Sequence, residues 1–249
     1  MKKIFLALLF MVSVFIQGCT QGSDSSKTSV MLVLYSYPTH WFDDEALISL
    51  SNNIDGDFVT IINPDNGVGY SKSETFVEGI EYLHSLHSKV IGYIYTQYGS
   101  RDKEEIYDEI DRYAEFYSPE HLEGIFFDEV ELKTVENERY MKDIASYARQ
   151  KGFDLIALNP GSEVKQSIVD ENFYDILLTY EDTYANYINH KNSMNSSEKT
   201  KQALAVYGCP DLPSFVDDVQ RAKSMQFDYI YFTIDDKPNP WDSVYNFLK

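Results

Sequence analysis

Cysteine is scarce in this sequence, which has only Cys19 and Cys209 among 249 residues. Two cysteines cannot build the disulfide framework of a small secreted scaffold. Cys209 has no neighbouring histidine or cysteine at metal-site spacing, so we expect a packed or idle thiol. The fold must therefore depend on a hydrophobic core, and an apolar fraction of 43% is sufficient to form one.

Basic residues are also scarce, with 21 Lys and Arg against 40 Asp and Glu and a formal net charge of −19. A protein that binds nucleic acid needs a basic surface, so this balance argues against nucleic acid as a partner. The charge permits attraction of a cationic ligand, although a solvated acidic surface accounts for most of it.

Long apolar runs are missing except near the start of the chain. Residues 4–16 are apolar and follow Lys2 and Lys3, and they are too short to span a bilayer comfortably. This is the layout of a secretory signal. The tripeptide that ends at Cys19 then resembles a bacterial lipobox, in which the cysteine becomes the lipidated first residue of the mature protein.

These features predict an extracytoplasmic lipoprotein that the membrane holds only through lipid on Cys19. The alternative is an ordinary signal that happens to contain a cysteine, in which case the protein is secreted. The predicted division of the chain is a signal peptide over 1–18, a flexible tether over 19–29 and one folded domain over 30–249.

Eight short apolar segments alternate with amphipathic ones at the period of βα units. The predicted strands are 30–35, 58–62, 90–95, 125–128, 155–158, 176–180, 203–207 and 229–234. Predicted helices include 44–52, 74–86, 103–117, 137–150 and 212–224. The count of eight and the total length favour a single-domain (β/α)8 barrel. A doubly wound open sheet is the alternative, but no glycine-rich phosphate fingerprint follows the first strand.

The fourth predicted strand ends in two adjacent acids, Asp128 and Glu129, which are too costly to bury unpaired in its apolar middle. Glu181 closes the sixth strand in the same way. In a barrel the carboxyl ends of all strands share one face, so acids on strands four and six face each other across the mouth. Glycoside hydrolysis requires such a pair of carboxylates. The acids could instead cap helices or hold a metal.

Aromatic and amide side chains surround these acids in the predicted face, and no Lys ends a strand there. Tyr and Trp stack against sugar rings, while Asn and Asp bind hydroxyl groups. The Asn-Pro pairs could be turns only, and Trp241 could equally be core. The candidate substrate-binding residues from position are Tyr35, Tyr37, His40, Trp41, Asn63, Tyr95, Asn159, Tyr207, Asp235 and Trp241.

An ordered series of motifs over nearly the whole mature chain, from about Val30 to the end, resembles the spherulin-4-like proteins of glycoside hydrolase family 135. The motifs are Tyr35-Ser36-Tyr37-Pro38, Ile62-Asn63-Pro64 with Gly67 and Gly69, Gly92-Tyr93 with Thr96, Tyr98, Gly99 and Arg101, residues 124–129, Leu158-Asn159-Pro160-Gly161, Tyr180-Glu181, and residues 233–236 with Asn239-Pro240-Trp241.

The resemblance implies a (β/α)8 barrel that cleaves α-1,4-linked N-acetylgalactosamine stretches within an exopolysaccharide. It places the essential acids at Asp128, Glu129 and Glu181, and it adds Tyr93, Tyr98 and Arg101 to the substrate-binding residues. The family is best known from fungi, whereas a lipobox implies a bacterium. A bacterial member would act on a galactosaminogalactan- or Pel-like matrix, whose partly deacetylated forms are cationic and would be attracted to an acidic protein.

By analogy with retaining α-glycosidase barrels, we expect Asp128 to be the nucleophile and Glu181 the general acid/base, with Glu129 tuning charge or holding substrate. We expect a monomer that needs no cofactor. The order of roles and the choice between retaining and inverting chemistry stay open at this point. The alternatives are a carbohydrate-binding lipoprotein without activity, and a deacetylase, which would need a metal cluster that the sequence does not display.

Overall fold

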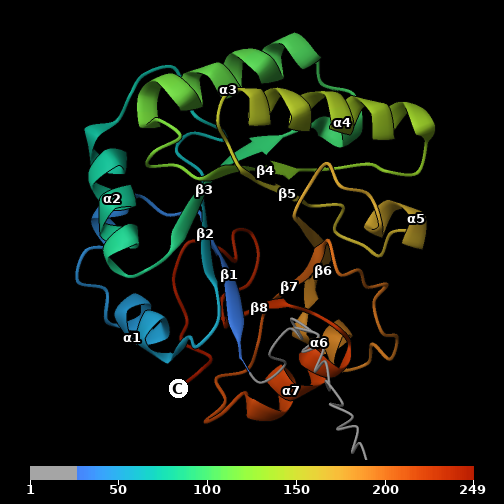
Figure 1. Cartoon of the computed structure of the whole chain (residues 1–249). Coiled ribbons are helices and arrows are strands. Elements are labelled where there is room, and N and C mark those ends of the chain that lie inside the picture. Colours follow the sequence, from blue (N-terminus) through green and yellow to red (C-terminus); the bar gives the residue numbers. More distant parts are fainter. Residues whose placement is uncertain (1–26) are drawn as a thin grey trace, which may run out of the picture.

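The computed structural model describes residues 27–249, and the predicted signal peptide, Cys19 and most of the tether lie outside them. Eight parallel strands follow one another in chain order around a closed barrel, and β1 pairs with β8 to close it (Figure 1). The predicted (β/α)8 barrel is therefore confirmed. The strands are β1 (Ser29–Leu34), β2 (Phe58–Ile62), β3 (Lys89–Tyr95), β4 (Gly124–Asp128), β5 (Leu155–Leu158), β6 (Ile176–Thr183), β7 (Lys201–Tyr207) and β8 (Tyr229–Phe232).

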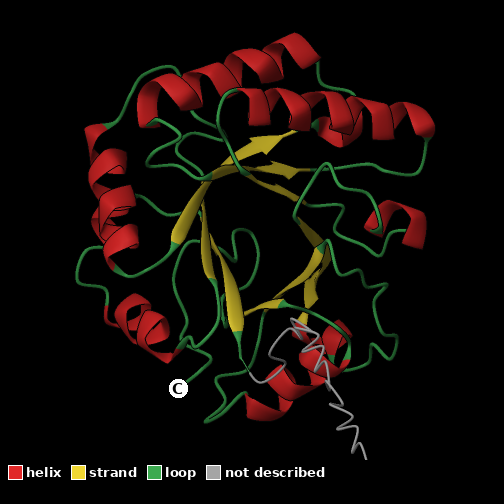
Figure 2. Ribbon diagram, in the orientation of Figure 1, coloured by secondary structure: helices red, strands yellow, loops and turns green. Residues whose placement is uncertain are grey.

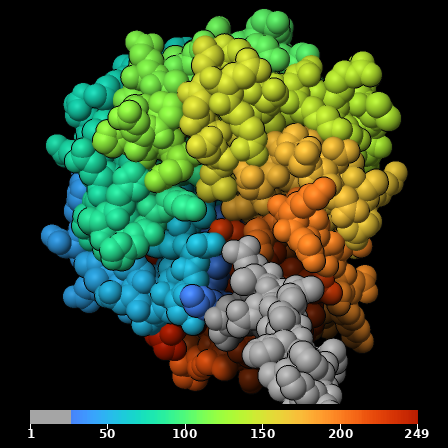
Figure 3. Space-filling model, viewed as in Figure 1, coloured from blue at the N-terminus to red at the C-terminus, as the bar shows by residue number. Residues whose placement is uncertain are grey.

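Helices form the outer layer around the strands (Figure 2). They are α1 (Glu45–Asn53), α2 (Glu74–Ser85), α3 (Lys103–Tyr117), α4 (Val135–Gln150), α5 (Gln166–Val169), α6 (Tyr184–Tyr187) and α7 (Val216–Ser224), with short 3-10 turns η1 (Pro38–His40) and η2 (Gln97–Gly99). In the space-filling view the colours follow one another around this face in chain order, from blue through green and yellow to orange (Figure 3). Within the described part of the chain, no helix is both long and apolar enough to cross a bilayer.

Two element boundaries differ from the prediction in ways that have a physical reason. Helix α7 begins at Val216 rather than at 212, because Pro213 lies in the stretch before it and Ser214 accepts a hydrogen bond from the Val216 amide. Strand β6 continues to Thr183 rather than ending near Tyr180, so Glu181 lies within the strand. The other strands begin and end within two residues of their predicted limits.

The barrel wall is apolar because each strand is covered on both faces. All five residues of β2 are buried, and so are the apolar residues of β4 and the last three residues of β5. Helices α3 and α4 pack beside each other outside the wall, where the Tyr107 and Tyr147 rings stack at 4.1 Å between centroids. This packing fixes the strand ends on which the site is built.

Acidic side chains recur at the amino-terminal edge of the barrel. An acid directly precedes each of the strands β4, β6 and β8. Its carboxylate accepts a hydrogen bond from the amide of the second residue of the preceding strand, and it also forms an ion pair with a basic side chain. The three sets are Glu123 with Val90 N (2.7 Å) and His84 (3.2 Å), Asp175 with Ile156 N (2.7 Å) and Arg149 (2.9 Å), and Asp228 with Gln202 N (2.9 Å) and Lys201 (3.0 Å). These acids tie neighbouring strands together at the edge opposite the expected active face.

We predict that Asp175→Asn lowers the free energy of unfolding by about 1–2 kcal/mol, because a charge-assisted bond to the Ile156 amide and the pair with Arg149 are both weakened. Urea unfolding followed by circular dichroism measures the change. The matched control is Asp154→Asn. Asp154 is an exposed acid directly before β5, the strand that contains Ile156, and its substitution should lower the free energy of unfolding by less than about 0.5 kcal/mol. Equal losses in the two variants would contradict this role for Asp175.

Candidate active site

Two carboxylates from different strands meet at the mouth of the barrel. Asp128 ends β4 and Glu181 lies in β6, while Asn159 follows β5, the strand between them. The Asn159 Nδ2 donates to Asp128 Oδ1 at 2.8 Å and to Glu181 Oε2 at 2.7 Å. Because one nitrogen bonds to both, these two oxygens are at most the sum of those distances apart, about 5.5 Å.

A β-bulge in β6 sets the direction of Glu181. Leu178 pairs with Ala203 and Tyr180 with Leu204, so Thr179 is an extra residue relative to β7. In a regular strand residues 178 and 181 would point to opposite faces, but one extra residue puts them on the same face. Tyr180 then packs outward, with its ring 6.1 Å from that of Tyr187 in α6. The bulge thus turns Glu181 into the barrel mouth.

Burial raises the pKa of both carboxyl groups. For Asp128 this is opposed by hydrogen bonds from the Glu129 amide, the Tyr93 hydroxyl and Asn159. For Glu181 it is opposed by Asn159 and Trp241, while the nearby charge of Asp128 adds to the increase and Lys237 reduces it. Two acids this close cannot both ionise easily, so the pair favours sharing one proton. One group is then suited to act as an acid while the other stays charged.

Two tyrosine side chains, Tyr35 and Tyr93, lie beside the carboxylate pair. The Tyr35 and Tyr93 rings lie edge to face with centroids 5.3 Å apart. Burial, with the charge of Asp128 next in size, raises the pKa of both hydroxyls. They therefore remain protonated donors, and Tyr93 uses its hydroxyl to hold Asp128.

A pocket of about 470 Å³ opens beside Glu181. It is lined by Tyr35, Glu181, Tyr207, Lys237, Pro238, Asn239, Pro240 and Trp241. The Tyr207 and Trp241 rings meet edge to face at 5.9 Å and form an aromatic wall. Trp241, for which core packing was the alternative, is largely buried yet borders the pocket and donates to Glu181.

Lys237 is a residue of the mouth that the sequence did not suggest, because it lies beyond the end of β8 and no Lys ends a strand. The loop after β8 brings its Nζ within 5.7 Å of the Tyr207 ring centroid, and it lines the same pocket as Glu181. Its charge lowers the pKa of Glu181 against the effect of burial. No local sequence signal distinguishes it from an ordinary surface lysine.

Glu129 has an unusual backbone. Its φ is +52°, in the left-handed region that few residues other than glycine adopt. Its carbonyl oxygen accepts from Thr96 Oγ1 at 2.7 Å and from the Tyr98 amide at 2.6 Å. Glu129 is half-buried beside Asp128 rather than opposite it, so it is not the second member of the carboxylate pair.

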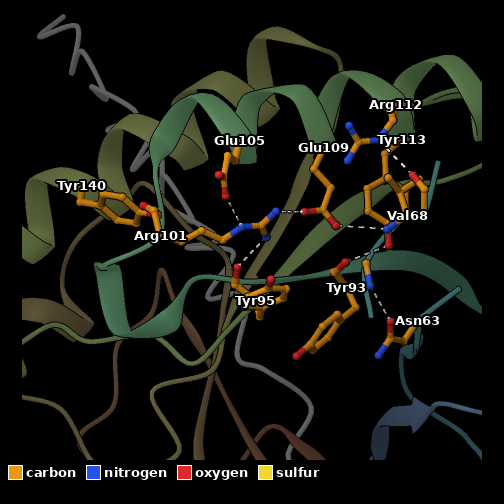
Figure 4. Close-up of polar contacts among 12 residues, drawn as sticks. Asn63, Val68, Tyr93, Tyr95, Arg101, Glu105, Glu109, Arg112, Tyr113 and Tyr140 are labelled. Atoms are coloured by element: carbon orange, nitrogen blue, oxygen red, sulfur yellow. Dashed lines mark hydrogen bonds and ion pairs between the residues drawn. The ribbon is translucent and has the colours of Figure 1, made fainter. Parts of the chain in front are cut away.

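The side chains of Trp41 and Arg101, two predicted substrate-binding residues, make structural contacts instead. Trp41 is 1% exposed, donates to Ser36 Oγ at 3.0 Å and packs edge to face on Phe76, so it belongs to the core. Arg101 donates to Glu109 at 2.6 Å and to the Tyr95 carbonyl at 3.0 Å (Figure 4).

The network around Arg101 is structural. Glu109, 3% exposed, also accepts from the Val68 amide at 3.1 Å, so the pair links the loop after β2 to the loop after β3. The guanidinium lies 4.4 Å from the Tyr95 ring centroid and covers that ring. Tyr93 directs its hydroxyl away from this network (Figure 4).

The remaining predicted residues line the loops around the mouth. Asn63 caps a turn, since its Oδ1 accepts from the Gly67 amide at 2.8 Å. Asp235 accepts from the Ser243 hydroxyl. Among the predicted substrate-binding residues, Tyr37, His40 and Tyr98 have exposed side chains. Tyr70, which was not predicted, is 90% exposed in the loop after β2.

No group of three or more His, Cys, Asp or Glu side chains with metal-site geometry occurs among residues 27–249. Cys209 is buried, and burial raises the pKa of its thiol to about 12. It is therefore the packed thiol that the sequence suggested.

A protein-family model matches nearly all of the part of the chain that the structure describes. The family model of spherulation-specific family 4 matches residues 29–249. Spherulin-4 of Physarum polycephalum is 27% identical over 146 residues, which are 58% of this chain and 42% of that protein. The chain therefore matches less than half the length of that relative.

A solved structure shares the fold. It is that of Sph3 from Aspergillus clavatus in complex with GalNAc, with a TM-score of 0.73 and 21% sequence identity over 88% of this chain and 93% of the other. This likeness supports the same barrel architecture.

Asn159→Ala should raise the pKa of both Asp128 and Glu181 further, because each carboxylate loses a donor while it stays buried. Carbon-13 NMR titration of the two carboxyl groups measures this. Asn63→Ala is the matched control: Asn63 also directly follows a strand, precedes a proline and accepts from a glycine amide, but it bonds to neither carboxylate. Unchanged carboxyl pKa values in Asn159→Ala would contradict the bridging role.

Proposed function

The chain belongs to spherulation-specific family 4, and from that membership and its carboxylate pair we propose that it is a glycoside hydrolase. Its substrate is a polysaccharide that contains N-acetylgalactosamine. The observation that carries the proposal is the pair of partly buried acids bridged by Asn159 at the open end of a barrel. Paired carboxylates with raised and mutually dependent pKa values are what glycosidic cleavage requires.

The short separation supports a retaining mechanism. Retaining glycosidases hold their two carboxyl groups about 5–5.5 Å apart, whereas inverting enzymes leave room for a water molecule between more distant groups. Asp128, which three donors stabilise as a carboxylate, attacks the anomeric carbon. Glu181 protonates the departing glycosidic oxygen, and then takes a proton from the water that releases the sugar from Asp128.

The finer substrate assignment is endo-cleavage of α-1,4-linked N-acetylgalactosamine or galactosamine in a galactosaminogalactan- or Pel-like polymer. It is supported by the family membership and by the GalNAc bound to the similar Sph3. The Tyr207–Trp241 wall borders the pocket beside Glu181, and Tyr37 and Tyr98 are exposed tyrosines in the loops after β1 and β3, where they could stack against a longer chain. Glu129 holds the substrate or tunes the charge of Asp128.

The start of the sequence supports a proposal about where the protein acts. We propose an extracytoplasmic protein tethered by lipid on Cys19, or secreted if that cysteine is not lipidated. A matrix polysaccharide outside the cell would then be within its reach.

Asp128→Asn and Glu181→Gln should each reduce kcat/KM by about a thousandfold or more, because each removes one half of the acid and nucleophile pair. New reducing ends released from an α-1,4-linked N-acetylgalactosamine polymer measure the activity, and circular dichroism checks the fold. Glu163→Gln, an exposed acid in the loop after β5, is the matched control and should keep full activity.

Near-full activity of either variant would remove that residue from the mechanism. If the wild-type protein binds the polymer but releases no reducing ends, it is a carbohydrate-binding lipoprotein on the same barrel, and the hydrolase proposal is wrong.

The first product should keep the α configuration at its new reducing end, because the distance between Asp128 and Glu181 suits a double displacement. Proton NMR of the anomeric region in the first minutes, before mutarotation, reads the configuration. An initial β product would mean that a water molecule attacks directly and that Asp128 is a base.

A further inference from the structure

We propose that Thr96 is a positioning residue, whose hydroxyl holds the Asp128–Glu129 turn in its reactive shape. The inference rests on the proposed function for its readout in activity, but its structural basis is independent of the substrate. Thr96 follows β3, is fully buried and does not line the pocket beside Glu181.

Two facing turns at this point adopt a strained backbone. Glu129 has φ +52°, and across from it Gln97 and Tyr98 have φ +50° and +55°. Left-handed conformations are unfavourable in residues other than glycine. Such conformations persist only where surrounding contacts determine them, and they cluster at functional sites. Tyr98 is also 64% exposed, so burial of its side chain does not explain its backbone.

Thr96 supplies the contacts that hold the two turns together. Its amide donates to the Asp128 carbonyl at 2.9 Å, and its hydroxyl donates to the Glu129 carbonyl at 2.7 Å. The Tyr98 amide donates to the same Glu129 carbonyl at 2.6 Å. Of these three bonds only the hydroxyl bond belongs to a side chain, so a substitution can remove it alone.

The orientation of Glu129 matters because hydrogen bonding from its amide lowers the pKa of the Asp128 carboxyl group against the effect of burial. Turning the Glu129 residue out of the left-handed region would move this N–H away from the carboxylate. On the other side the turn is held by the Val130 amide, which donates to the Asn159 carbonyl at 3.0 Å. Thr96 and Asn159 therefore hold the turn from β3 and β5, and each has a separate connection to Asp128.

Loss of the Thr96 hydroxyl should act on Asp128 in a defined direction. The groups that face Asp128 are Tyr35 after β1, Tyr93 in β3, Glu129 beside it, Asn159 after β5 and Glu181 in β6, with Lys237 beyond Glu181. Ionised Glu129 and Glu181 have no proton to donate, so neither carboxylate can replace a lost donor. The carboxylate form of Asp128 then becomes less stable, and its pKa rises.

The test compares Thr96→Val with wild type in polymer cleavage over a range of pH. We expect kcat to fall about 10- to 100-fold with little change in KM, because geometry at the reacting carboxylate is disturbed while the binding surface remains. The acidic limb of the pH profile should move to higher pH, since activity needs ionised Asp128. Thr96→Ser, which keeps the hydroxyl, should stay within about threefold of wild type.

Thr60→Val is the matched control. Thr60 is also a fully buried threonine on a neighbouring strand, and its hydroxyl bonds with Ser88 at 2.7 Å, away from the carboxylate pair. It should lose stability comparably and keep the wild-type pH profile. If Thr96→Val does not fold, Thr96→Ala removes the same hydroxyl without crowding the site and takes its place.

The inference is overturned if a folded variant without the hydroxyl keeps wild-type kcat and pH profile, or if Thr96→Ser loses as much activity as Thr96→Val. A wild-type protein that cleaves no polymer would refute the proposed function instead. In that case carbon-13 NMR titration of Asp128 still decides the inference, because an unchanged pKa in the Thr96 variants would refute it.

Discussion

One amide nitrogen between two carboxylates is the contact on which the active face depends. Asn159 bonds to Asp128 and Glu181 at the same time, and it can do so only because β5 lies between β4 and β6 in the closed barrel. Like charges at this distance repel strongly in a partly buried site. A donor shared by both therefore does two things: it lowers the cost of keeping the acids together, and it fixes the distance across which the proposed chemistry would occur.

The parts of the site that follow from strand ends were predictable from the sequence. Asp128 and Asn159 directly follow or end apolar runs, and parallel strands bring such positions to one edge. The sequence predicted that Glu181 lies at the barrel mouth because it would end β6. In the structure β6 continues past Glu181, and the bulge at Thr179 turns its side chain inward. A bulge depends on pairing with β7, which hydrophobic pattern in one strand does not reveal.

Side chains in loops were less predictable because their partners come from distant elements. Trp41 and Arg101 have residue types that suit sugar binding, yet one packs on α2 and the other pairs with a buried glutamate in α3. Lys237 was not predicted as a site residue, yet the loop after β8 places it in the same pocket as Glu181. The contacts of Trp41 and Lys237 join residues far apart in the chain, whereas Arg101 pairs with a glutamate in the following helix. The hydrophobic pattern of the sequence reveals none of these contacts.

The two ends of the barrel use acids in opposite ways, and this difference connects stability to the proposed function. At the amino-terminal edge, Glu123, Asp175 and Asp228 each have a base within 3.2 Å and a backbone donor, so their charges stabilise the fold. At the mouth, among residues 27–249, neither Asp128 nor Glu181 has a base within ion-pair distance, and burial raises the pKa of both. Residues that cost stability in this way persist when the rest of the structure holds them in place. The closed barrel and its stabilised amino-terminal edge hold the structure together. The strained Glu129 turn and the two acids without a basic partner can therefore remain at the end where a substrate would enter.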